Sequence, residues 1–246
     1  MKTKTSPSIQ YLKNSQTLTS QPGGLPPKWI LRMIRLGFQV PGRLLPRQAA
    51  RKALQLFITP RRSKKAPKLK PIMKSAQAFQ LPHKGGYVQA YAWGQGEARV
   101  LLVHGWNSKA SHWSAFIPPL VAAGYQVIAL DNPAHGHSAG TTSDLYDTRE
   151  AIRAVIECVG PVAHIVAHSF GGAASSFLLW DEKAALSVDK LVLMGAPVRL
   201  QWVIDDYARM IRLPRAAKKW LETYLERSVS HKIGDLDLSR TGNDLR

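Results

Sequence analysis

The stretch around Ser169 has the residue types and spacing expected of a catalytic nucleophile. It reads His164-Ile-Val-Ala-His-Ser-Phe-Gly-Gly172, an apolar strand pattern that runs directly into small residues and a helical pattern. A strand-to-helix turn this sharp brings the residues two before and two after the serine almost into contact, and Ala167 and Gly171 are small enough for that. The serine would then lie beside a helix N-terminus, where unpaired N–H groups favour negative charge. Small-x-Ser-x-Gly alone also fits an ordinary turn between a strand and a helix, so further signals are needed.

Two other motifs supply those signals. Val100-Leu-Leu-Val-His-Gly-Trp106 is an apolar strand pattern that ends in His-Gly and is followed by a polar loop. The backbone N–H groups of Trp106 and Phe170 are therefore candidate donors to an oxyanion. Asp131-Asn-Pro-Ala-His-Gly-His-Ser138 follows a third apolar strand pattern and contains the Gly and His residues of a loop at the carboxyl edge of a sheet.

The elements that must position these motifs alternate along the chain. A hairpin is predicted around His83-Lys84-Gly85-Gly86, because β-rich segments flank it. The other predicted elements are strands at 100–103, 126–130, 164–167 and 191–194, and helices at 111–123, 144–159 and 172–180. Short apolar strands that alternate with amphipathic helices indicate an α/β fold with a mostly parallel, doubly wound sheet.

The three motifs, in this order and spacing, resemble those of the α/β-hydrolase superfamily. The chain is also similar to a group of bacterial α/β-hydrolases that carry a basic helical N-terminal segment ending in residues like Phe57-Ile-Thr-Pro-Arg61, and a Val-Ala-His-Ser-Phe-Gly elbow matched here at residues 166–171. The similarity extends over roughly residues 29–238. It implies an α/β-hydrolase fold, Ser169 as nucleophile, and the N–H groups of Trp106 and Phe170 as oxyanion donors.

The acid and the histidine of a catalytic triad are harder to place. Hydrolases of this fold carry them after the seventh and eighth strands, whereas only 49 residues follow Pro197, just after the predicted sixth strand. Two cap helices, at 200–211 and 214–227, take up most of these, and two more strand–helix units of about 30 residues each do not fit. We therefore expect a C-terminally truncated fold that lacks the last two strands and the triad acid and base. Asp205 or Asp206 with His231 is a weak substitute in the correct order.

Three classes of function follow from these motifs. The first is a serine hydrolase that cleaves an ester, thioester or amide of a small acyl substrate through Ser169, with activity impaired by the missing triad partners. The second is a non-catalytic remnant or binding module on the same fold. The third, least favoured, is a protein that associates with a membrane or with nucleic acid and carries the hydrolase domain as a passenger.

The positive charge of the chain is concentrated at its N-terminus. Residues 1–75 contain ten Lys and seven Arg and no acidic residue, out of a net charge of +18 for the whole chain. Apolar residues are interleaved at helical spacing between residues 29 and 57, so residues 28–65 could contact an anionic membrane surface. The alternative is a solubilising tail followed by helices that pack on the core. Nucleic acid is an unlikely partner.

These patterns divide the chain into five parts. We expect a disordered tail at 1–27, a basic amphipathic helical segment and linker at 28–75, the hydrolase core at 76–197, a helical cap at 198–228 and an irregular end at 229–246. No signal peptide or membrane span is recognised, so a cytoplasmic location is expected, with peripheral contact at the inner membrane face as the alternative.

No metal site and no cofactor are expected. The single cysteine, Cys158, excludes a multi-cysteine metal site and a disulfide framework, and its apolar helical surroundings predict burial. His135-Gly-His137 resembles the paired histidines of metallo-hydrolase loops, but such a site needs further His or Asp ligands.

Overall fold

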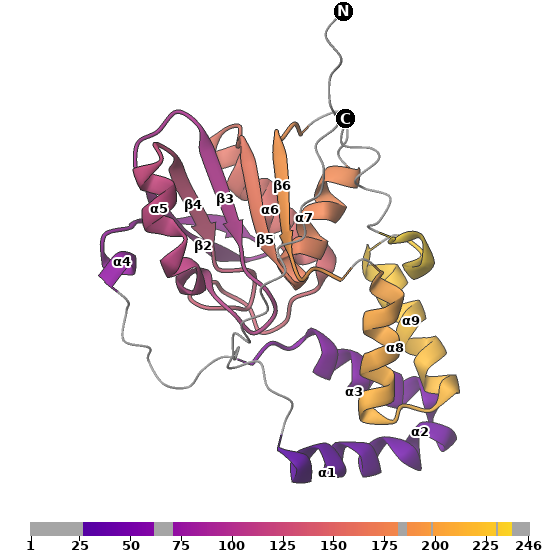
Figure 1. Cartoon of the computed structure of the whole chain (residues 1–246). Coiled ribbons are helices and arrows are strands. Elements are labelled where there is room, and N and C mark those ends of the chain that lie inside the picture. Colours follow the sequence, from indigo (N-terminus) through magenta and orange to yellow (C-terminus); the bar gives the residue numbers. More distant parts are fainter. Residues whose placement is uncertain (1–26, 62–70, 182–185, 198, 230, 238–246) are drawn as a thin grey trace, which may run out of the picture.

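The computed structural model describes residues 27–61, 71–181, 186–197, 199–229 and 231–237 (Figure 1). The predicted disordered tail and most of the predicted basic linker lie outside these residues. Two parts stand out in Figure 1, a sheet covered by helices and a separate group of helices beside it.

A mixed six-stranded sheet forms the larger part, with the strand order β1-β2-β4-β3-β5-β6. The β1–β2 hairpin and the β2–β4 pair are antiparallel, and the other pairs are parallel. The strands are β1 (Gln77–His83), β2 (Gly86–Trp93), β3 (Arg99–Val103), β4 (Gln126–Leu130), β5 (His164–His168) and β6 (Lys190–Met194). The predicted α/β fold with a mostly parallel sheet is confirmed.

Helices cover both faces of the sheet, because side chains alternate along the buried strands. Leu101 and Val103 of β3 pack on one face, against α6 (Leu145–Val159) and α7 (Phe170–Asp181). Val100 and Leu102 of the same strand pack on the other face. There they meet a 3-10 helix, η1 (Ala110–Ala115), and α5 (Ile117–Ala122). This is the doubly wound arrangement expected from the alternation of strands and helices.

The second part is a lobe of helices from both ends of the described chain, which we call the helical lobe. It consists of α1 (Lys28–Gln39), α2 (Pro41–Leu44), α3 (Pro46–Ile58), α8 (Leu200–Ile211) and α9 (Arg215–Val229). Fully buried side chains such as Ala50, Ala53, Ile204 and Leu221 form its core. Two short elements complete the fold: η2 (Ile233–Asp235) adds Ile233 to the core of the lobe, and α4 (Pro71–Lys74) packs through Met73 on the sheet part. The basic N-terminal helices thus pack on the cap helices, whereas the alternative derived from the sequence had them pack on the core.

Two details differ from the sequence predictions. The helix predicted at 111–123 is divided into η1 and α5, because Pro118 and Pro119 have no N–H to continue a single helix. Cys158 is exposed rather than buried. It lies on α6 away from the face formed by Ile152, Val155 and Ile156.

Strand β6 forms an edge of the sheet within the described residues. Its side chains Val192 and Leu193 remain 45% and 43% exposed. Among residues 199–229 and 231–237 the backbone forms no further strand, and an isolated bridge joins Arg199 to Asp237. None of the described helices is long and apolar enough to cross a membrane.

Candidate active site

Ser169 lies on a sharp turn between β5 and α7, at the carboxyl end of the parallel strands. Its φ of +49° is in the left-handed region, which a side chain other than glycine rarely adopts. The turn is held on both sides: the Ser169 amide donates to Met194 O (2.9 Å), and its carbonyl accepts from the amides of Gly172 (2.9 Å) and Ala173 (3.2 Å). The backbone therefore keeps Ser169 in a strained geometry that presents its half-buried side chain at the sheet edge.

Small residues around Ser169 let three backbone segments meet. A Cβ added to Gly171 would lie 2.4 Å from the carbonyl oxygen of His104 and 2.8 Å from Val103 Cγ1. A Cβ added to Gly105 would lie 3.1 Å from the Ser169 Cβ. The close contacts at Gly171 fit the predicted need for a small residue there, and the glycine of the His-Gly motif is under the same constraint.

The loop after β3 passes beside the elbow. Asn107 has a φ of +56°, and its amide donates to Nε2 of His135 (3.1 Å). The Trp106 ring packs edge-on between His135 and Phe170, with centroids 5.0 Å from each. Within the described part of the chain, no hydrogen bond uses the amide of Trp106 or of Phe170. The two predicted oxyanion donors thus lie on adjacent segments, and neither amide donates a hydrogen bond to another described group.

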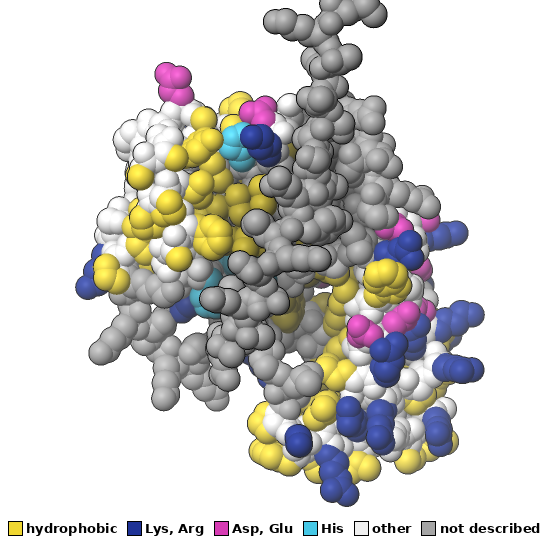
Figure 2. All heavy atoms as spheres, in the orientation of Figure 1, with side chains coloured by type: hydrophobic (Ala, Val, Ile, Leu, Met, Phe, Trp, Pro, Cys, Tyr) yellow, Lys and Arg dark blue, Asp and Glu magenta, His cyan; other side chains and the backbone are white. Residues whose placement is uncertain are grey.

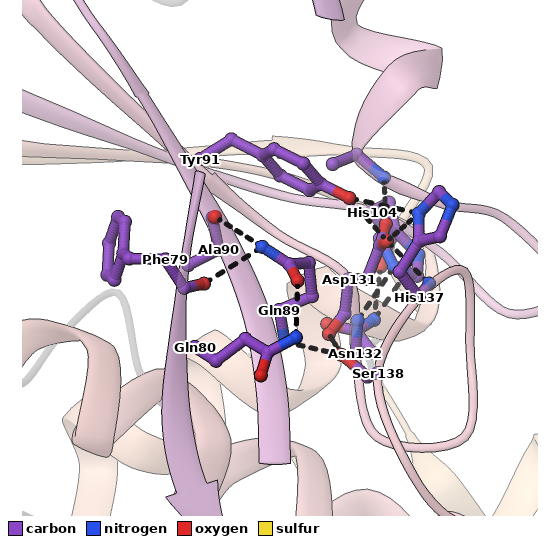
Figure 3. Close-up of polar contacts among 11 residues, drawn as sticks. Phe79, Gln80, Gln89, Ala90, Tyr91, His104, Asp131, Asn132, His137 and Ser138 are labelled. Atoms are coloured by element: carbon purple, nitrogen blue, oxygen red, sulfur yellow. Dashed lines mark hydrogen bonds and ion pairs between the residues drawn. The ribbon is translucent and has the colours of Figure 1, made fainter. Parts of the chain in front are cut away.

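A buried carboxylate, Asp131, supports this loop from the next strand (Figure 3). Its Oδ1 accepts from the Ala110 amide (2.7 Å), and its Oδ2 accepts from the His137 amide (2.8 Å) and the Tyr91 hydroxyl (3.2 Å). Burial acts to raise the pKa of Asp131, but hydrogen bonds from His137 and Ala110 outweigh it and hold the pKa below its ordinary value. Asp131 is therefore ionised and holds its own loop and the one after β3 together.

His104 joins the same network through Asn132, the residue that follows Asp131 (Figure 3). Its Nε2 accepts from the Asn132 amide (2.9 Å), so the proton is on Nδ1, which donates to Gly105 O (2.8 Å). Burial is the main reason that the pKa of His104 falls to about 3, and the neighbouring His135 lowers it further. His104 is neutral at neutral pH and positions the loop instead of transferring protons.

A cavity of about 810 Å³ opens beside Ser169, between the sheet edge and the helical lobe. Trp106 and Phe170 also line it. The helical lobe contributes residues from α1, α3, α8 and α9, together with the run Leu56, Phe57, Ile58, Thr59, Pro60 and Arg61. The volume of the cavity lies within the range typical of small-molecule sites. The motif analysis missed the wall formed by the N-terminal helices. The only signal for it was the likeness of residues 57–61 to the N-terminal segment of related hydrolases.

None of the eight histidines of the chain is hydrogen-bonded to Ser169, and all eight lie within the described residues. His168, next to Ser169, is exposed. His231 packs edge-on against Phe177 and Trp180 of α7, with centroids 5.4 Å and 5.3 Å away. Since Phe177 is eight residues along the helix from Ser169, His231 lies near the far end of α7, about 12 Å along its axis.

The two candidate acids have other partners. Asp205 accepts from Lys218 (2.6 Å) and from Gln201 (2.9 Å). Asp206 lines the cavity and pairs with Arg209 (2.6 Å). The structure does not bring either acid together with His231. No group of three or more potential metal ligands occurs in the residues that the structure describes, and His135 and His137 are both used in the network around Asp131.

Three known proteins illustrate what the chain is similar to in sequence or in fold. A 2-hydroxy-6-oxononadienedioate/2-hydroxy-6-oxononatrienedioate hydrolase of Escherichia coli (strain K12 / DH10B) is 40% identical over 113 residues, which are 42% of this chain and 37% of the relative. The chain thus spans little more than a third of that relative's length. An epoxide hydrolase from Vigna radiata is 22% identical, with a TM-score of 0.44 over 49% of this chain and 40% of its own. A thioesterase domain from the curacin biosynthetic pathway is 24% identical, with a TM-score of 0.46 over 54% of this chain and 51% of its own.

The sequence model of the Alpha/beta hydrolase family matches residues 100–240. That segment begins in β3 and contains the loop after β3, the elbow at Ser169, and helices α8 and α9. It is more than half of the chain, which therefore belongs to the alpha/beta hydrolase family.

Proposed function

We propose that this chain is a serine hydrolase in which Ser169 attacks the carbonyl carbon of an ester, thioester or amide. The observation that carries the proposal is the left-handed φ of +49° at Ser169. A strained backbone at a non-glycine residue costs about 1–3 kcal/mol and persists mainly where function requires it. Here the strain turns the side chain away from the strand and toward the cavity.

The chemistry follows from the surroundings of that hydroxyl. Attack of the Ser169 oxygen on the carbonyl carbon forms a tetrahedral adduct and places negative charge on the former carbonyl oxygen. In this proposal the amides of Trp106 and Phe170 donate to this oxygen, and the N-terminus of α7 adds its partial positive charge. Collapse of the adduct expels the alcohol, thiol or amine, and water then releases the acid and regenerates the serine.

Removal of the serine proton is the step that this chain supports poorly. No histidine bonds to Ser169 in the described residues, so we expect the hydroxyl to react more slowly than the serine of a complete triad. Triad enzymes that lose one member keep a residual acceleration of about 10³–10⁴ from the oxyanion hole and binding. We expect turnover in this residual range. The alternative is a binding module on the same fold, in which the cavity holds a ligand without cleaving it.

An activity-based probe distinguishes these two proposals. A fluorophosphonate should label the purified chain slowly but stoichiometrically, and Ser169→Ala should abolish the label, while Ser75→Ala, at an exposed and remote serine, should leave it unchanged. Hydrolysis of p-nitrophenyl butyrate should follow the same order. Labelling that persists in Ser169→Ala would contradict the assignment of the nucleophile. Absence of any labelling would favour the binding module.

A second proposal concerns the outer face of the helical lobe, which we propose contacts an anionic membrane surface. Six of the twelve exposed large hydrophobic side chains of the described residues fall between residues 29 and 45. They are Trp29, Met33, Leu36, Val40, Leu44 and Leu45. The α1, α2 and α3 helices carry several exposed Lys and Arg and no acidic residue. Figure 2 shows hydrophobic and basic side chains mixed over this lobe, a combination typical of helices that lie in a lipid interface.

Vesicle sedimentation tests the membrane proposal. The chain should sediment with vesicles that contain phosphatidylserine, and salt should release it, because the basic residues act through screened electrostatic attraction. Trp29→Glu with Met33→Glu should remove most of the binding, and Tyr87→Glu, at an exposed aromatic residue of β2, is the matched control. Equal sedimentation with neutral vesicles, or no loss in the double variant, would refute the proposal.

A further inference from the structure

The wall of the cavity opposite the sheet is built by residues that precede the family-matched segment. Leu31 and Ile34 of α1 line the cavity, and so do the residues from Leu56 at the end of α3 to Arg61. All of these come before residue 100, where the family match begins. The cavity next to Ser169 is therefore completed by a part of the chain outside the family's common core.

This wall is fastened to the sheet part at the site itself. The carbonyl of Ile58 accepts from the Ser143 amide (2.8 Å). The amide of Arg61 donates to Oδ1 of Asn107 (2.7 Å), the residue that follows the proposed oxyanion donor Trp106. Residues 58–61 thus bridge the helical lobe and the loop after β3.

The same wall is fastened to the cap helices on its other side. The Tyr207 hydroxyl of α8 donates to the Ala53 carbonyl (2.8 Å), and the Tyr207 ring packs against Phe57 with centroids 4.8 Å apart. Burial raises the pKa of Tyr207, so the hydroxyl stays protonated and keeps this hydrogen bond. The wall is held from both sides, and the cavity is a preformed site.

The lining selects against charged ligands. Most of its residues are aliphatic or aromatic, and Ser169 is one of few hydroxyl groups. Its ionisable side chains are Arg61, Asp144, Asp206 and Tyr207, and Asp206 is paired with Arg209. These groups carry no surplus of positive charge that would attract an anion, and a charged ligand inside an apolar cavity would lose its hydration without compensating contacts.

We propose that this cavity binds an uncharged acyl chain, with its carbonyl at Ser169 and its tail against Leu31, Ile34 and the 56–61 segment. The proposal rests on the proposed function only for the position of the carbonyl. The N-terminal helices then determine which acyl length the site accepts. Each methylene buried in the cavity should raise the affinity about three- to fourfold, until the chain reaches the end of the wall.

Binding of primary alcohols to Ser169→Ala tests the chemistry of the ligand without any turnover. Butanol, hexanol and octanol are titrated by isothermal calorimetry, with octanedioate as a charged chain of equal length. The expected result is an affinity that rises about tenfold for every two methylenes, and octanedioate binding at least tenfold more weakly than octanol. A flat alcohol series, or octanedioate binding as tightly as octanol, would overturn the proposal.

Two variants test whether the N-terminal wall is part of the site. Leu56→Glu places a carboxylate in the lining at a side chain that is 50% exposed, so the fold should tolerate it. Leu44→Glu makes the same change at a 75% exposed position outside the lining. Octanol affinity should fall about tenfold in Leu56→Glu and stay unchanged in Leu44→Glu. Equal affinities in the two variants, with unfolding transitions like that of the parent, would show that the wall does not contact the ligand.

The outcomes separate this inference from the proposed function. If octanol binds as expected but the fluorophosphonate never labels Ser169, the acyl site stands and the hydrolase proposal fails. If Ser169 is labelled but alcohol binding does not depend on chain length, the hydrolase proposal stands and the acyl site fails.

Discussion

Gly171 offers a sharp test of how tightly the elbow is packed. A methyl group at this position would lie 2.4 Å from the His104 carbonyl oxygen and 2.8 Å from Val103 Cγ1. The first contact is with backbone that the Asn132 side chain also holds, through a hydrogen bond to the same carbonyl (2.9 Å), so it cannot rotate away. Overpacking of this kind costs about 1–3 kcal/mol, whereas Ala in a helix gains about 1 kcal/mol over Gly. We expect Gly171→Ala to lower the free energy of unfolding by about 2 kcal/mol, because a backbone contact places the cost at the top of that range.

Gly37 is the matched control, because it also lies in a helix but has nothing within 4 Å of an added Cβ. Gly37→Ala should be neutral or stabilising by up to about 1 kcal/mol. For a chain of this size about 2 kcal/mol corresponds to a fall in Tm of roughly 4–8 °C, which differential scanning calorimetry resolves. Fluorophosphonate labelling of Gly171→Ala should also slow, since α7 must shift away from the loop after β3. A Tm for Gly171→Ala equal to or above that of Gly37→Ala would refute the packing argument.

Three further predictions concern the network, the elbow and the sheet edge. Asp131→Asn should lower the free energy of unfolding by about 1–3 kcal/mol near pH 7, because an amide cannot accept from both the Tyr91 and His137 sides and the Ala110 side. Because the pKa of Asp131 is lowered in the folded state, its contribution is present above the ordinary carboxyl pKa and is lost as pH falls through the lowered folded-state pKa. The free energy of unfolding measured in urea should therefore fall with acidification in the parent, and it should fall less in the variant. Ser169→Gly should be more stable than Ser169→Ala by about 1 kcal/mol in the same assay, since only glycine adopts the left-handed φ without strain; equal stabilities would contradict the strain argument. Val192→Lys should reduce aggregation measured by light scattering, because it places a charge on an exposed edge strand, and unchanged scattering would show that this edge is not involved.

The apolar runs in the sequence were enough to predict most strands of the sheet. The strand predicted at 126–130 coincides with β4, and the strand predicted at 164–167 is one residue shorter than β5. Continuous apolar runs identify buried parallel strands because both faces of such a sheet are covered. The apolar runs could not predict the order of the strands in the sheet. β2 pairs with β4 rather than with β3, which follows it in the chain.

The sequence predictions failed where a single residue decides between two local structures. The apolar spacing from Trp113 to Val121 fits one helix, but Pro118 and Pro119 allow a helix only from their own first turn onward, so η1 precedes α5. The exposure of Cys158 could have been predicted from helical geometry. At about 100° per residue it points roughly 120° away from Ile152.

The sequence motifs were enough to predict the backbone turn and loop that form one side of the site. The motifs around Ser169 and Trp106 specify a strained turn and a neighbouring loop, and both occur where the pattern places them. The opposite wall was not predictable, because the apolar spacing of Ile34 or Phe57 identifies a buried face without naming the surface that covers it. The pairing of residues 58–61 with Ser143 and Asn107 uses the backbone groups of Ile58 and Arg61, and these leave no pattern in the side chains of that segment.

The bridge at residues 58–61 has a consequence for how such proteins diverge. Because the wall of the cavity is encoded ahead of the segment shared with other hydrolases, substitutions there could retune ligand preference while the elbow and its neighbouring loop stay constant. Two chains of this kind could then have nearly identical cores and different ligands. Transfer of the N-terminal helices from one to the other, joined at residue 61, would carry the preference with it.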